Sequence, residues 1–381
     1  MPIVQEVSAI SDIPDALWQT LAATTYPFMQ RGFLQALEES GSVSASAGWK
    51  PRHLLVKDDT TLLAFLPMYE KSHSYGEYVF DWAWADAYQR HGFPYYPKLV
   101  TAIPFTPVAG PRWLLHPKAD RKDIVERLMN KVAEISENER LSGWHVLFPD
   151  DCTANDLKEQ PLIERNACQY RWHNPGYQTF DDFLAALSSR KRKNLRKERR
   201  DVAAQGFQFH RISGRDMTPE RWEDFYRFYQ STYMVRGMQG YLSSSFFTMI
   251  QEAIPDSFFL VFAELDQKPV AGAIFFTGDD TLYGRYWGCD ADYMNLHFET
   301  CYYQGIDYCI ENGMTLFDAG AQGEHKLKRG FYPIITKSFH KVMHPGFEEA
   351  IASFCHEEKG HVDAYAREAA ALLPYKNESD H

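Results

Sequence analysis

The sequence lacks a long apolar run. No stretch of its 381 residues approaches the roughly 18 to 20 uninterrupted apolar residues that a membrane-spanning helix needs. The first residues, MPIVQEVSAISDIP (1–14), carry acidic side chains where a secretory signal would have a basic start followed by an apolar segment. These two absences predict a cytoplasmic protein without an integral membrane segment.

Cysteine is scarce and scattered. The sequence contains six cysteines and no CxxC pair, at Cys152, Cys168, Cys289, Cys301, Cys309 and Cys355. This spacing does not provide the paired thiols of a zinc site or the framework of a disulfide-stabilised domain. In HFE (297–299), His297 and Glu299 lack a third ligand at suitable spacing. We therefore expect reduced thiols in the core and no metal site.

A local excess of positive charge occurs in one segment. The net charge of −11 at pH 7 disfavours a protein that coats nucleic acid nonspecifically, so no DNA partner is expected. The exception is SRKRKNLRKERR (189–200), in which eight Lys and Arg residues lie between Arg190 and Arg200.

This basic run permits three interpretations. It fits an exposed helix face, an anion site for a nucleotide diphosphate or a tRNA backbone, or a patch that meets anionic lipid. The side chains selected for a functional face are Arg192, Lys193 and Arg196.

The chain is, by contrast, rich in apolar and aromatic residues, at 45% and 15% of 381 residues, which predicts a globular protein of two domains. An internal repeat supports this division. Shifting the sequence by 208 residues places KDDTTLLAFLPM (57–68) over LDQKPVAGAIFF (265–276), and YGEY (75–78) over YGRY (283–286).

Both halves show the same order of expected elements. Two helices come first, followed by a strand, a hairpin-like turn with two more strands, a helix and a last strand. The helices are expected at 13–22, 29–40 and 120–137, and at 218–231, 243–254 and 297–312; the clearest strands are expected at 53–57 and 144–149, and at 258–265 and 315–320. We infer an α/β protein with mixed sheets, built from two copies of one domain.

The expected domains are residues 1–160, 161–345 and a helical C-terminal segment, 346–381. The first has an aromatic insertion at 83–114. The second begins with a basic helix at 180–206, ended by Gly206, with Phe180, Phe183, Leu184, Leu187, Leu195 and Val202 as its buried stripe. A terminal strand at 335–344 and helices at 346–357 and 360–373 complete the chain.

Several segments resemble a known family. PVAGAIFF (269–276) with LYGRYWGCD (282–290) resembles the central hairpin of GNAT acyltransferases, and CYYQGIDYCIENGMTLFDAG (301–320) their following helix and strand. LKRGF (327–331) and the basic helix are similar to segments of the FemAB-like peptidoglycan aminoacyl transferases of bacteria. The resemblance implies tandem GNAT domains that transfer an acyl group to an amine of a phosphate-bearing acceptor, with cell-wall precursors as the acceptor class.

The resemblance leaves the acyl donor open between an acyl-CoA and an aminoacyl-tRNA. A typical acetyl-CoA enzyme has a glycine-rich turn that grips the pyrophosphate, whereas CDADYMNLHFE (289–299) has two aspartates and no glycine. No segment matches the helical-hairpin arm of tRNA-using ligases. Two further hypotheses therefore stand: a binding protein on this scaffold without donor chemistry, and a nucleic-acid module based on the basic helix.

The candidate site is FDAGAQGEHKLKRGF (317–331), a strand end followed by glycines and charges. An amine acceptor needs a base, and the tetrahedral oxyanion needs a donor. The candidate bases are Asp318, Glu324 and His325, and Lys328 is the position onto which the Fem-type lysine is carried by resemblance. The expected substrate-binding residues are Arg285, Tyr286, Gly320, Gly323, Lys326 and Arg329.

Two alternatives accompany this assignment. The charges at 324–329 also fit a solvated helix start, with Glu324 near the positive end of the dipole. The proton donor to the leaving group is one of Tyr286, Tyr302, Tyr303 or Tyr332. In the first half, YGEYVFDWAWADAY (75–88) is either a wall of the acceptor groove, by resemblance, or an aromatic plug between the domains.

Overall fold

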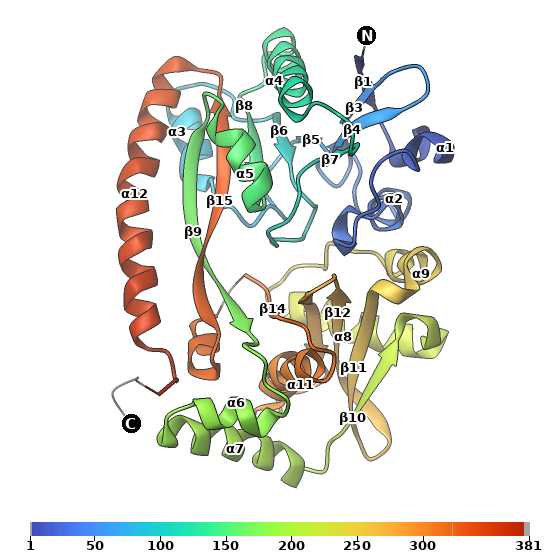
Figure 1. Cartoon of the computed structure of the whole chain (residues 1–381), viewed down its shortest axis with the longest axis vertical. Coiled ribbons are helices and arrows are strands. Elements are labelled where there is room, and N and C mark those ends of the chain that lie inside the picture. The colour runs from blue at the N-terminus through green and yellow to red at the C-terminus, as the bar shows by residue number, and fades with distance from the viewer. Residues whose placement is uncertain (1, 322, 377–381) are drawn as a thin grey trace. The chain divides into compact units, whose positions relative to one another are not determined.

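A computed structural model describes residues 2–321 and 323–376 (Figure 1). The chain divides into two compact units. Unit 1 comprises residues 1–167 and 335–363, and unit 2 comprises residues 168–334 and 364–381. Each unit is described by itself below.

Unit 1 has two sheets. One has the order β1-β3-β4-β7, and the other contains β15, β8, β6, β5 and β2 in that order. The strands are β1 (Ile3–Val7), β2 (Trp49–Pro51), β3 (His53–Lys57), β4 (Leu62–Leu66), β5 (Tyr69–Lys71), β6 (Lys98–Thr101), β7 (Leu114–Leu115), β8 (Gly143–Leu147) and the part of β15 (Tyr332–Val342) from residue 335 onward. The helices are η1 (Ile10–Asp12), α1 (Asp15–Trp18), η2 (Pro27–Met29), α2 (Arg31–Glu39), α3 (Trp82–Arg90), α4 (Arg121–Asn138) and α5 (Asp151–Lys158).

Helix α4 forms where its sequence predicts it. The Asp120 side chain caps the N-terminus by accepting from the backbone N–H groups of Lys122 and Asp123. The predicted stripe of Ile124, Leu128 and Val132 is buried in the core of unit 1. Hydrophobic burial on this face therefore holds α4 in place.

Unit 2 contains the sheet strands β10-β11-β12-β13-β14, with the later part of β9 paired to β14. The strands are β9 (Ile163–His173), β10 (Gln208–Ser213), β11 (Phe258–Leu265), β12 (Lys268–Thr277), β13 (Thr281–Cys289) and β14 (Leu316–Asp318). The helices are α6 (Phe180–Ala186), α7 (Ser189–Ala204), η3 (Gly214–Asp216), α8 (Pro219–Met234), α9 (Ser244–Ala253), η4 (Pro255–Ser257), α10 (Leu296–Phe298), the π-helical η5 (Glu299–Tyr303), α11 (Gln304–Glu311) and η6 (Glu324–Arg329).

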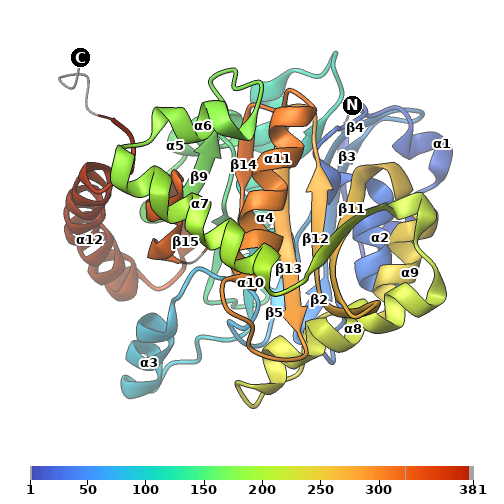
Figure 2. The same cartoon turned by 90° about the horizontal axis from the view of Figure 1, so that it is seen from below.

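Helices α8 and α11 cover opposite faces of the unit 2 sheet (Figure 2). A Cβ on Gly272 of β12 would lie 3.2 Å from Phe225 of α8. A Cβ on Gly305 of α11 would lie 3.2 Å from the ring of Phe275, three residues farther along the same strand. Since strand side chains alternate between faces, residues 272 and 275 point to opposite sides. Gly272 and Gly305 therefore allow a helix to pack closely against each face of the sheet.

The predicted α/β class with mixed sheets is confirmed, whereas several expected boundaries are wrong. YGEY (75–78) lies in a turn with Gly76 at φ +80, not in a strand. The 180–206 segment forms two helices, α6 and α7, because Leu187 and Ser188 adopt extended backbone between them. The two helices expected at 346–357 and 360–373 are replaced by one continuous helix, α12 (Pro345–Ala371), which passes through Gly360.

Strand β15 also differs from the expected division of the chain. We expected residues 161–345 to form the second domain, whereas Ser338–Val342 pairs antiparallel with β8 in unit 1. The aromatic insertion at 83–114 supplies a sheet strand, because β6 pairs parallel with β8. These pairings connect segments far apart in sequence, which local patterns do not reveal.

Of the helices in the described ranges, 2–321 and 323–376, none combines the length and apolar character required to cross a membrane.

Two glycine substitutions test the close packing of unit 2. In Gly288→Ala, the added Cβ would meet the Phe228 carbonyl oxygen of α8 at 1.8 Å, so the helix must shift. We expect a loss of about 1–3 kcal/mol in unfolding free energy, the usual cost of overpacking. Gly360→Ala is the matched control, because its Cβ meets nothing within 4 Å on α12. It should gain about 1 kcal/mol from helix propensity. Equal melting temperatures for the two variants would contradict the packing described.

Candidate functional site

The candidate site begins where the pairing of β13 and β14 ends. Tyr283 opposes Asp318 in the last parallel pair, and β13 then continues to Cys289 without β14 beside it. Asp318 is 1% exposed. Its carboxylate accepts from the Gly320 backbone N–H at 3.1 Å and lies 3.2 Å from the Arg171 guanidinium of β9. The strand end thus holds a buried, paired carboxylate.

Two glycines turn the chain back toward this carboxylate. Gly320 has φ +89 and Gly323 has φ +112, a region that residues with side chains rarely adopt. A Cβ on Gly323 would also lie 2.4 Å from the His325 ring. The reversal lets the Lys326 ammonium of η6 donate to the Gly320 carbonyl oxygen.

Lys326 is the buried cation of this site. The residue is 1% exposed. Burial lowers the pKa of Lys326 to about 8; the Asp318 carboxylate opposes this shift, and the Arg285 guanidinium adds to it. Lys326 is therefore mostly protonated at neutral pH and loses its proton readily above it.

A β-bulge in β13 places the side chains of Arg285 and Tyr286 in different surroundings. Ala273 opposes Trp287 and Phe275 opposes Gly284, so both intervening residues of β13 face one residue of β12. Arg285 Nη1 lies 4.0 Å from the position of a Cβ on Gly320, which places it beside the Asp318 and Lys326 group. Tyr286 packs edge-on against Tyr229 of α8, with ring centroids 5.4 Å apart.

His325 and Tyr302 form a second pair. His325 Nε2 lies 2.7 Å from the Tyr302 hydroxyl of η5. Burial, followed by the charges of Arg329 and Lys326, lowers the pKa of His325 to about 4, so its ring is neutral at pH 7. Burial also raises the pKa of Tyr302, which keeps the phenol protonated. The pair suits hydrogen bonding to a substrate better than removal of a proton from an ammonium.

Arg329 connects η6 to α7. Its guanidinium donates to both Glu198 oxygens, at 2.9 Å each from Nη2, and to the His325 carbonyl at 2.9 Å. Tyr303 donates to the same Glu198 carboxylate. The Arg329 guanidinium also lies 3.3 Å from the Phe298 ring centroid. These contacts assign Arg329 a role in fixing the position of η6.

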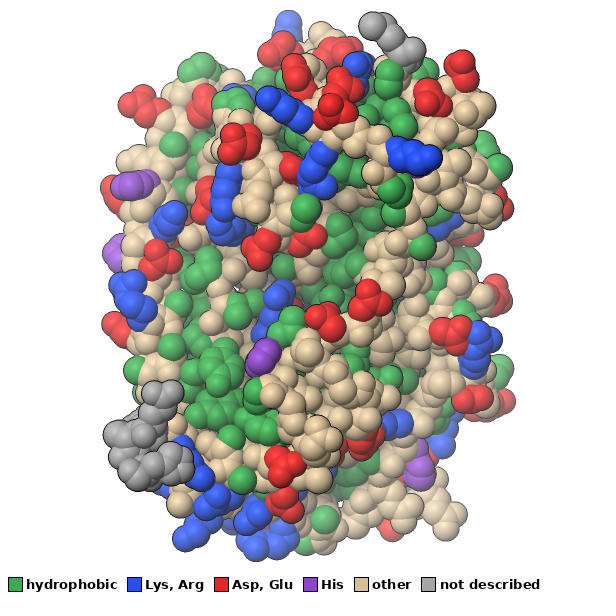
Figure 3. Space-filling view, in the orientation of Figure 1, with side chains coloured by type: hydrophobic (Ala, Val, Ile, Leu, Met, Phe, Trp, Pro, Cys, Tyr) green, Lys and Arg blue, Asp and Glu red, His purple; other side chains and the backbone are tan. Residues whose placement is uncertain are grey.

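The remaining predicted residues lie nearer the surface. Lys328 and Glu324 are exposed, and Glu324 accepts from the Tyr365 hydroxyl at 2.8 Å. On α7, Lys193 is exposed, and Arg196 pairs with Asp181 at 2.8 Å. Arg192 of the same helix is half-buried. Lys and Arg side chains gather at the lower edge of the space-filling view, where α7 lies (Figure 3). Each of these residues remains outside the Asp318, Lys326 and Arg285 group.

Sequence reasoning missed Glu198 and Arg171 as supports of the site. Glu198 carried a signal, because it is the single acidic residue within the basic run 189–200. A carboxylate in such a run suggests a specific internal partner, here Arg329 and Tyr303. Arg171 gave no signal, because its pairing with Asp318 depends on the register of β9 against β14.

The turn after β13 lacks the glycines that let backbone N–H groups bind a pyrophosphate. Asp290 and Asp292 lie in it. The backbone carbonyl oxygen of Asn295, a residue at φ +62, accepts from the Phe298 and Glu299 backbone N–H groups at the start of α10. Like charge between the aspartates and a phosphate would oppose binding there. The absence of a standard acyl-CoA site in this turn stays a prediction.

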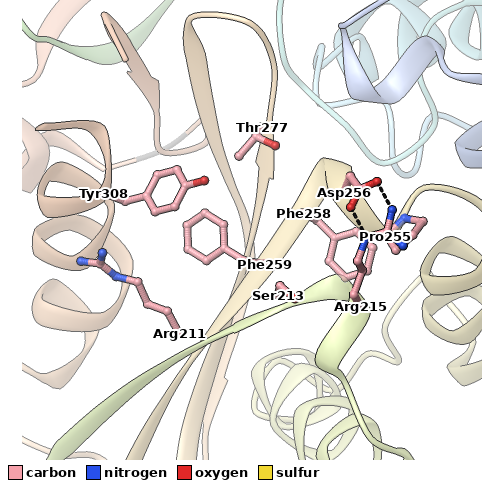
Figure 4. A pocket seen from close by; sticks show the side chains of 9 residues that line it. All are labelled: Arg211, Ser213, Arg215, Pro255, Asp256, Phe258, Phe259, Thr277 and Tyr308. Atoms are coloured by element: carbon pink, nitrogen blue, oxygen red, sulfur yellow. Dashed lines mark hydrogen bonds and ion pairs between the residues drawn. The ribbon is translucent and has the colours of Figure 1, made fainter. Parts of the chain in front are cut away.

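A cavity of about 330 Å³ lies elsewhere in unit 2 (Figure 4). It is lined by Arg211, Ser213, Arg215, Pro255, Asp256, Phe258, Phe259, Thr277 and Tyr308. Its guanidinium groups already pair with carboxylates, Arg215 with Asp256 and Arg211 with Glu311. None of the residues predicted for the site lines this cavity.

Comparison with known proteins finds a family model that matches nearly the whole chain. The model of the FemAB-like family, described as peptidoglycan biosynthesis/recognition, matches residues 9–377. A comparison with curated proteins finds no relative.

Solved structures share the fold. The C-terminal domain of a putative lysylphosphatidylglycerol synthetase from Agrobacterium fabrum is similar at TM-score 0.55 and 10% identity, covering 92% of this chain and 96% of that one. FemX is similar at TM-score 0.49 and 12% identity, covering 83% and 93%. A tandem GNAT protein from the clavulanic acid biosynthesis pathway is similar at 0.45 and 10%, covering 91% and 99%. The match of the family model over residues 9–377 confirms the predicted FemAB-like resemblance and the tandem GNAT-like fold that it implies.

The burial of Lys326 predicts a specific pH dependence of stability. Folding lowers the pKa of this lysine from 10.5 to about 8, so the unfolded chain binds more protons between these values. Wild-type stability should therefore rise with pH relative to Lys326→Met across this interval, by about 3 kcal/mol in total. Denaturant unfolding of both proteins from pH 7 to pH 10.5 measures the difference.

Lys328→Met is the matched control, because this exposed lysine lies two positions away on the same η6. Its stability should follow the wild-type pH curve. Parallel curves for Lys326→Met and the wild type would show that the Lys326 ammonium is not buried.

Proposed function

The chain belongs to the FemAB-like family, and we propose that it is an N-acyltransferase or aminoacyltransferase of the GNAT type. The acceptor in this proposal is an amine on a phosphate-bearing molecule, with cell-wall precursors as the class suggested by the family description. The single observation that carries the proposal is the buried Lys326 ammonium beside Asp318 at the end of β14. Buried charged groups with strongly shifted pKa values are concentrated at functional sites.

Lys326 and Arg285 supply the positive charge that acyl transfer needs. The attacking amine forms a bond to the acyl carbon, and the carbonyl oxygen becomes negative in the tetrahedral intermediate. Two cations held at one strand end stabilise this oxyanion or the phosphate of the acceptor. Burial strengthens the effect because little water screens the charges.

Lys326 also suits the proton transfer in this reaction. The ammonium of the acceptor must lose a proton, and the leaving oxygen or sulfur of the donor must gain one. A group with a pKa of about 8 exchanges protons in both directions near neutral pH. In this assignment Asp318 orients Lys326, and the neutral His325 holds Tyr302 as a hydrogen-bond donor to the leaving group.

One observation favours an alternative function. The turn at 289–295 contains Asp290 and Asp292 and no glycine, so an acyl-CoA pyrophosphate has no evident cradle there. A ligand-binding protein on the same scaffold, without donor chemistry, accounts for this feature. Such a protein binds the acceptor and yields no product.

Donor binding and product formation distinguish these functions. Purified protein is tested by thermal shift against acyl-CoAs, charged and uncharged tRNA, and UDP-linked peptidoglycan precursors. A ligand at 100 times its dissociation constant raises the stability by about 2.7 kcal/mol. Each stabilising donor and acceptor pair is then incubated with the protein, and acylated amine is measured by mass spectrometry. A ligand shift without product supports the binding protein, and no shift with any donor contradicts the transferase.

Two lysines of η6 provide the matched test of the site. We expect Lys326→Met to lower turnover by about 100-fold or more, as for loss of an oxyanion donor. Lys328→Met, which alters an exposed side chain, should lower turnover by less than about 10-fold, as for a peripheral charge. A larger loss with Lys328→Met would assign the catalytic lysine to position 328, as the sequence resemblance implies.

A further inference from the structure

Unit 1 contains a buried cluster of charges that the proposed function does not use. Its four members are Lys71 at the end of β5, Lys98 at the start of β6, and Glu77 and Asp81 from the segment between them. All four are buried. We refer to them as the polar centre.

Lys98 joins the members of the polar centre. Its ammonium donates to Ser74 Oγ at 3.0 Å, to Glu77 Oε2 at 2.8 Å and to Asp81 Oδ2. The Tyr95 hydroxyl donates to the same Asp81 oxygen at 2.6 Å. All three ammonium protons of Lys98 thus have acceptors.

Lys71 occupies the other side of the centre. Its ammonium lies 3.8 Å from the Trp49 ring centroid and donates to the Tyr75 carbonyl oxygen at 3.2 Å. The distance from Lys71 Nζ to Glu77 Oε1 is 3.9 Å, which is an ion pair without a hydrogen bond. An aromatic wall therefore already accommodates one cation here.

Stability does not explain this arrangement. Removing charges from water costs several kcal/mol per ion, and well-packed apolar side chains of similar volume often stabilise a core at least as well. A buried cluster of two lysines and two carboxylates is therefore better explained by function.

Two carboxylate oxygens of the centre lack a hydrogen bond from any described residue, although one of them, Glu77 Oε1, lies in the ion pair with Lys71. Glu77 Oε1 and Asp81 Oδ1 are buried and accept no hydrogen bond from the parts of the chain that the structure describes. Buried acceptors of this kind normally have donors. A group that donates several hydrogen bonds and carries positive charge is the complement of both atoms.

The segment that covers the polar centre buries polar side chains and exposes aromatic ones. Within residues 74–82, the side chains of Ser74, Glu77 and Asp81 are buried. Tyr75, Phe80 and Trp82 are, by contrast, exposed at 51%, 58% and 42%. A segment folded only for stability would bury its aromatic residues and expose its carboxylates. The observed arrangement, with carboxylates facing inward and aromatic rings facing outward, is expected of a cover whose inner face contacts a polar ligand.

We propose that the polar centre is a second ligand site, which binds a small molecule through a primary ammonium group received by Glu77 and Asp81. Residues 72–82 form its cover. An ammonium has three donors, enough for both carboxylate oxygens that lack a hydrogen bond from the described chain, and the neighbouring Trp49 and Tyr95 rings favour a cation. The site lies within unit 1 and does not depend on the acyl transfer proposed for unit 2.

The protonation behaviour of the centre supports this assignment. Burial raises the pKa of Glu77 to about 7, while the charges of Lys98 and Lys71 oppose the shift and that of Asp81 adds to it. Burial lowers the pKa of Lys71 to about 7. An arriving ammonium would favour the ionised form of Glu77 and thereby gain a charge-assisted hydrogen bond.

Calorimetric titration of the full chain tests the proposal. The probes are ethylammonium, L-alanine and L-lysine at pH 7.5. Their fully N-acetylated forms, with both nitrogens of lysine acetylated, serve as controls without the ammonium. We expect saturable binding of at least one ammonium probe and none of its acetylated form. Glu77→Gln combined with Asp81→Asn should weaken binding by about tenfold or more, which corresponds to about 1.4 kcal/mol.

Glu134→Gln is the control variant, because Glu134 lies on the surface of α4 in the same unit, where it pairs with Lys131. Its affinity for the probe should equal that of the wild type. Absence of saturable binding to the wild type would overturn the proposal. Unchanged affinity in the folded double variant would also overturn it.

A measurement on the wild type alone keeps the test decisive if the double variant fails to fold. Saturating ammonium probe should slow amide hydrogen exchange in residues 72–82, because binding stabilises the closed cover. Slowing confined to unit 2, or no slowing in this segment, would overturn the proposal.

Discussion

The burial of one ammonium group is the constraint on which the unit 2 site depends. Lys326 reaches the interior because Gly320 and Gly323 turn the chain through positive φ. It is tolerated there because Asp318 and the Gly320 carbonyl surround it with negative charge. Without the turn, η6 would present its lysines to water, and the strand end would hold a carboxylate paired only with Arg171.

The rest of unit 2 holds this arrangement in position. Glu198 of α7 binds Arg329 and Tyr303, while Arg199 of the same helix pairs with Glu299 at 2.8 Å and Asp307 at 2.7 Å. The basic helix thus directs two charged side chains inward, toward η6 and the helix that carries Tyr302. Of its other charges, Arg192 is half-buried, Lys193 is exposed, and Arg196 pairs with Asp181.

Local patterns in the sequence predicted much of the fold. The apolar stripe of α4, the burial of Leu195 and Val202 on α7, and the glycine turns after β14 follow from residue spacing and backbone preference. The resemblance selected Lys328, whereas Lys326 is the buried lysine of η6. Residue spacing did not reveal this burial, because it depends on how η6 is rotated against its neighbours. The polar centre of unit 1 was also hidden. Its members come from β5, β6 and a turn, and only strand pairing brings them together.

The most direct test of the account is the ionisation of Lys326 itself. Lysine labelled with ¹³C at Cε allows each ammonium to be titrated by NMR, and comparison with Lys326→Met assigns the resonance of interest. The account predicts that this resonance titrates near pH 8, well below the usual range of a lysine side chain. Titration above pH 10 would contradict the buried ammonium on which the proposed site depends.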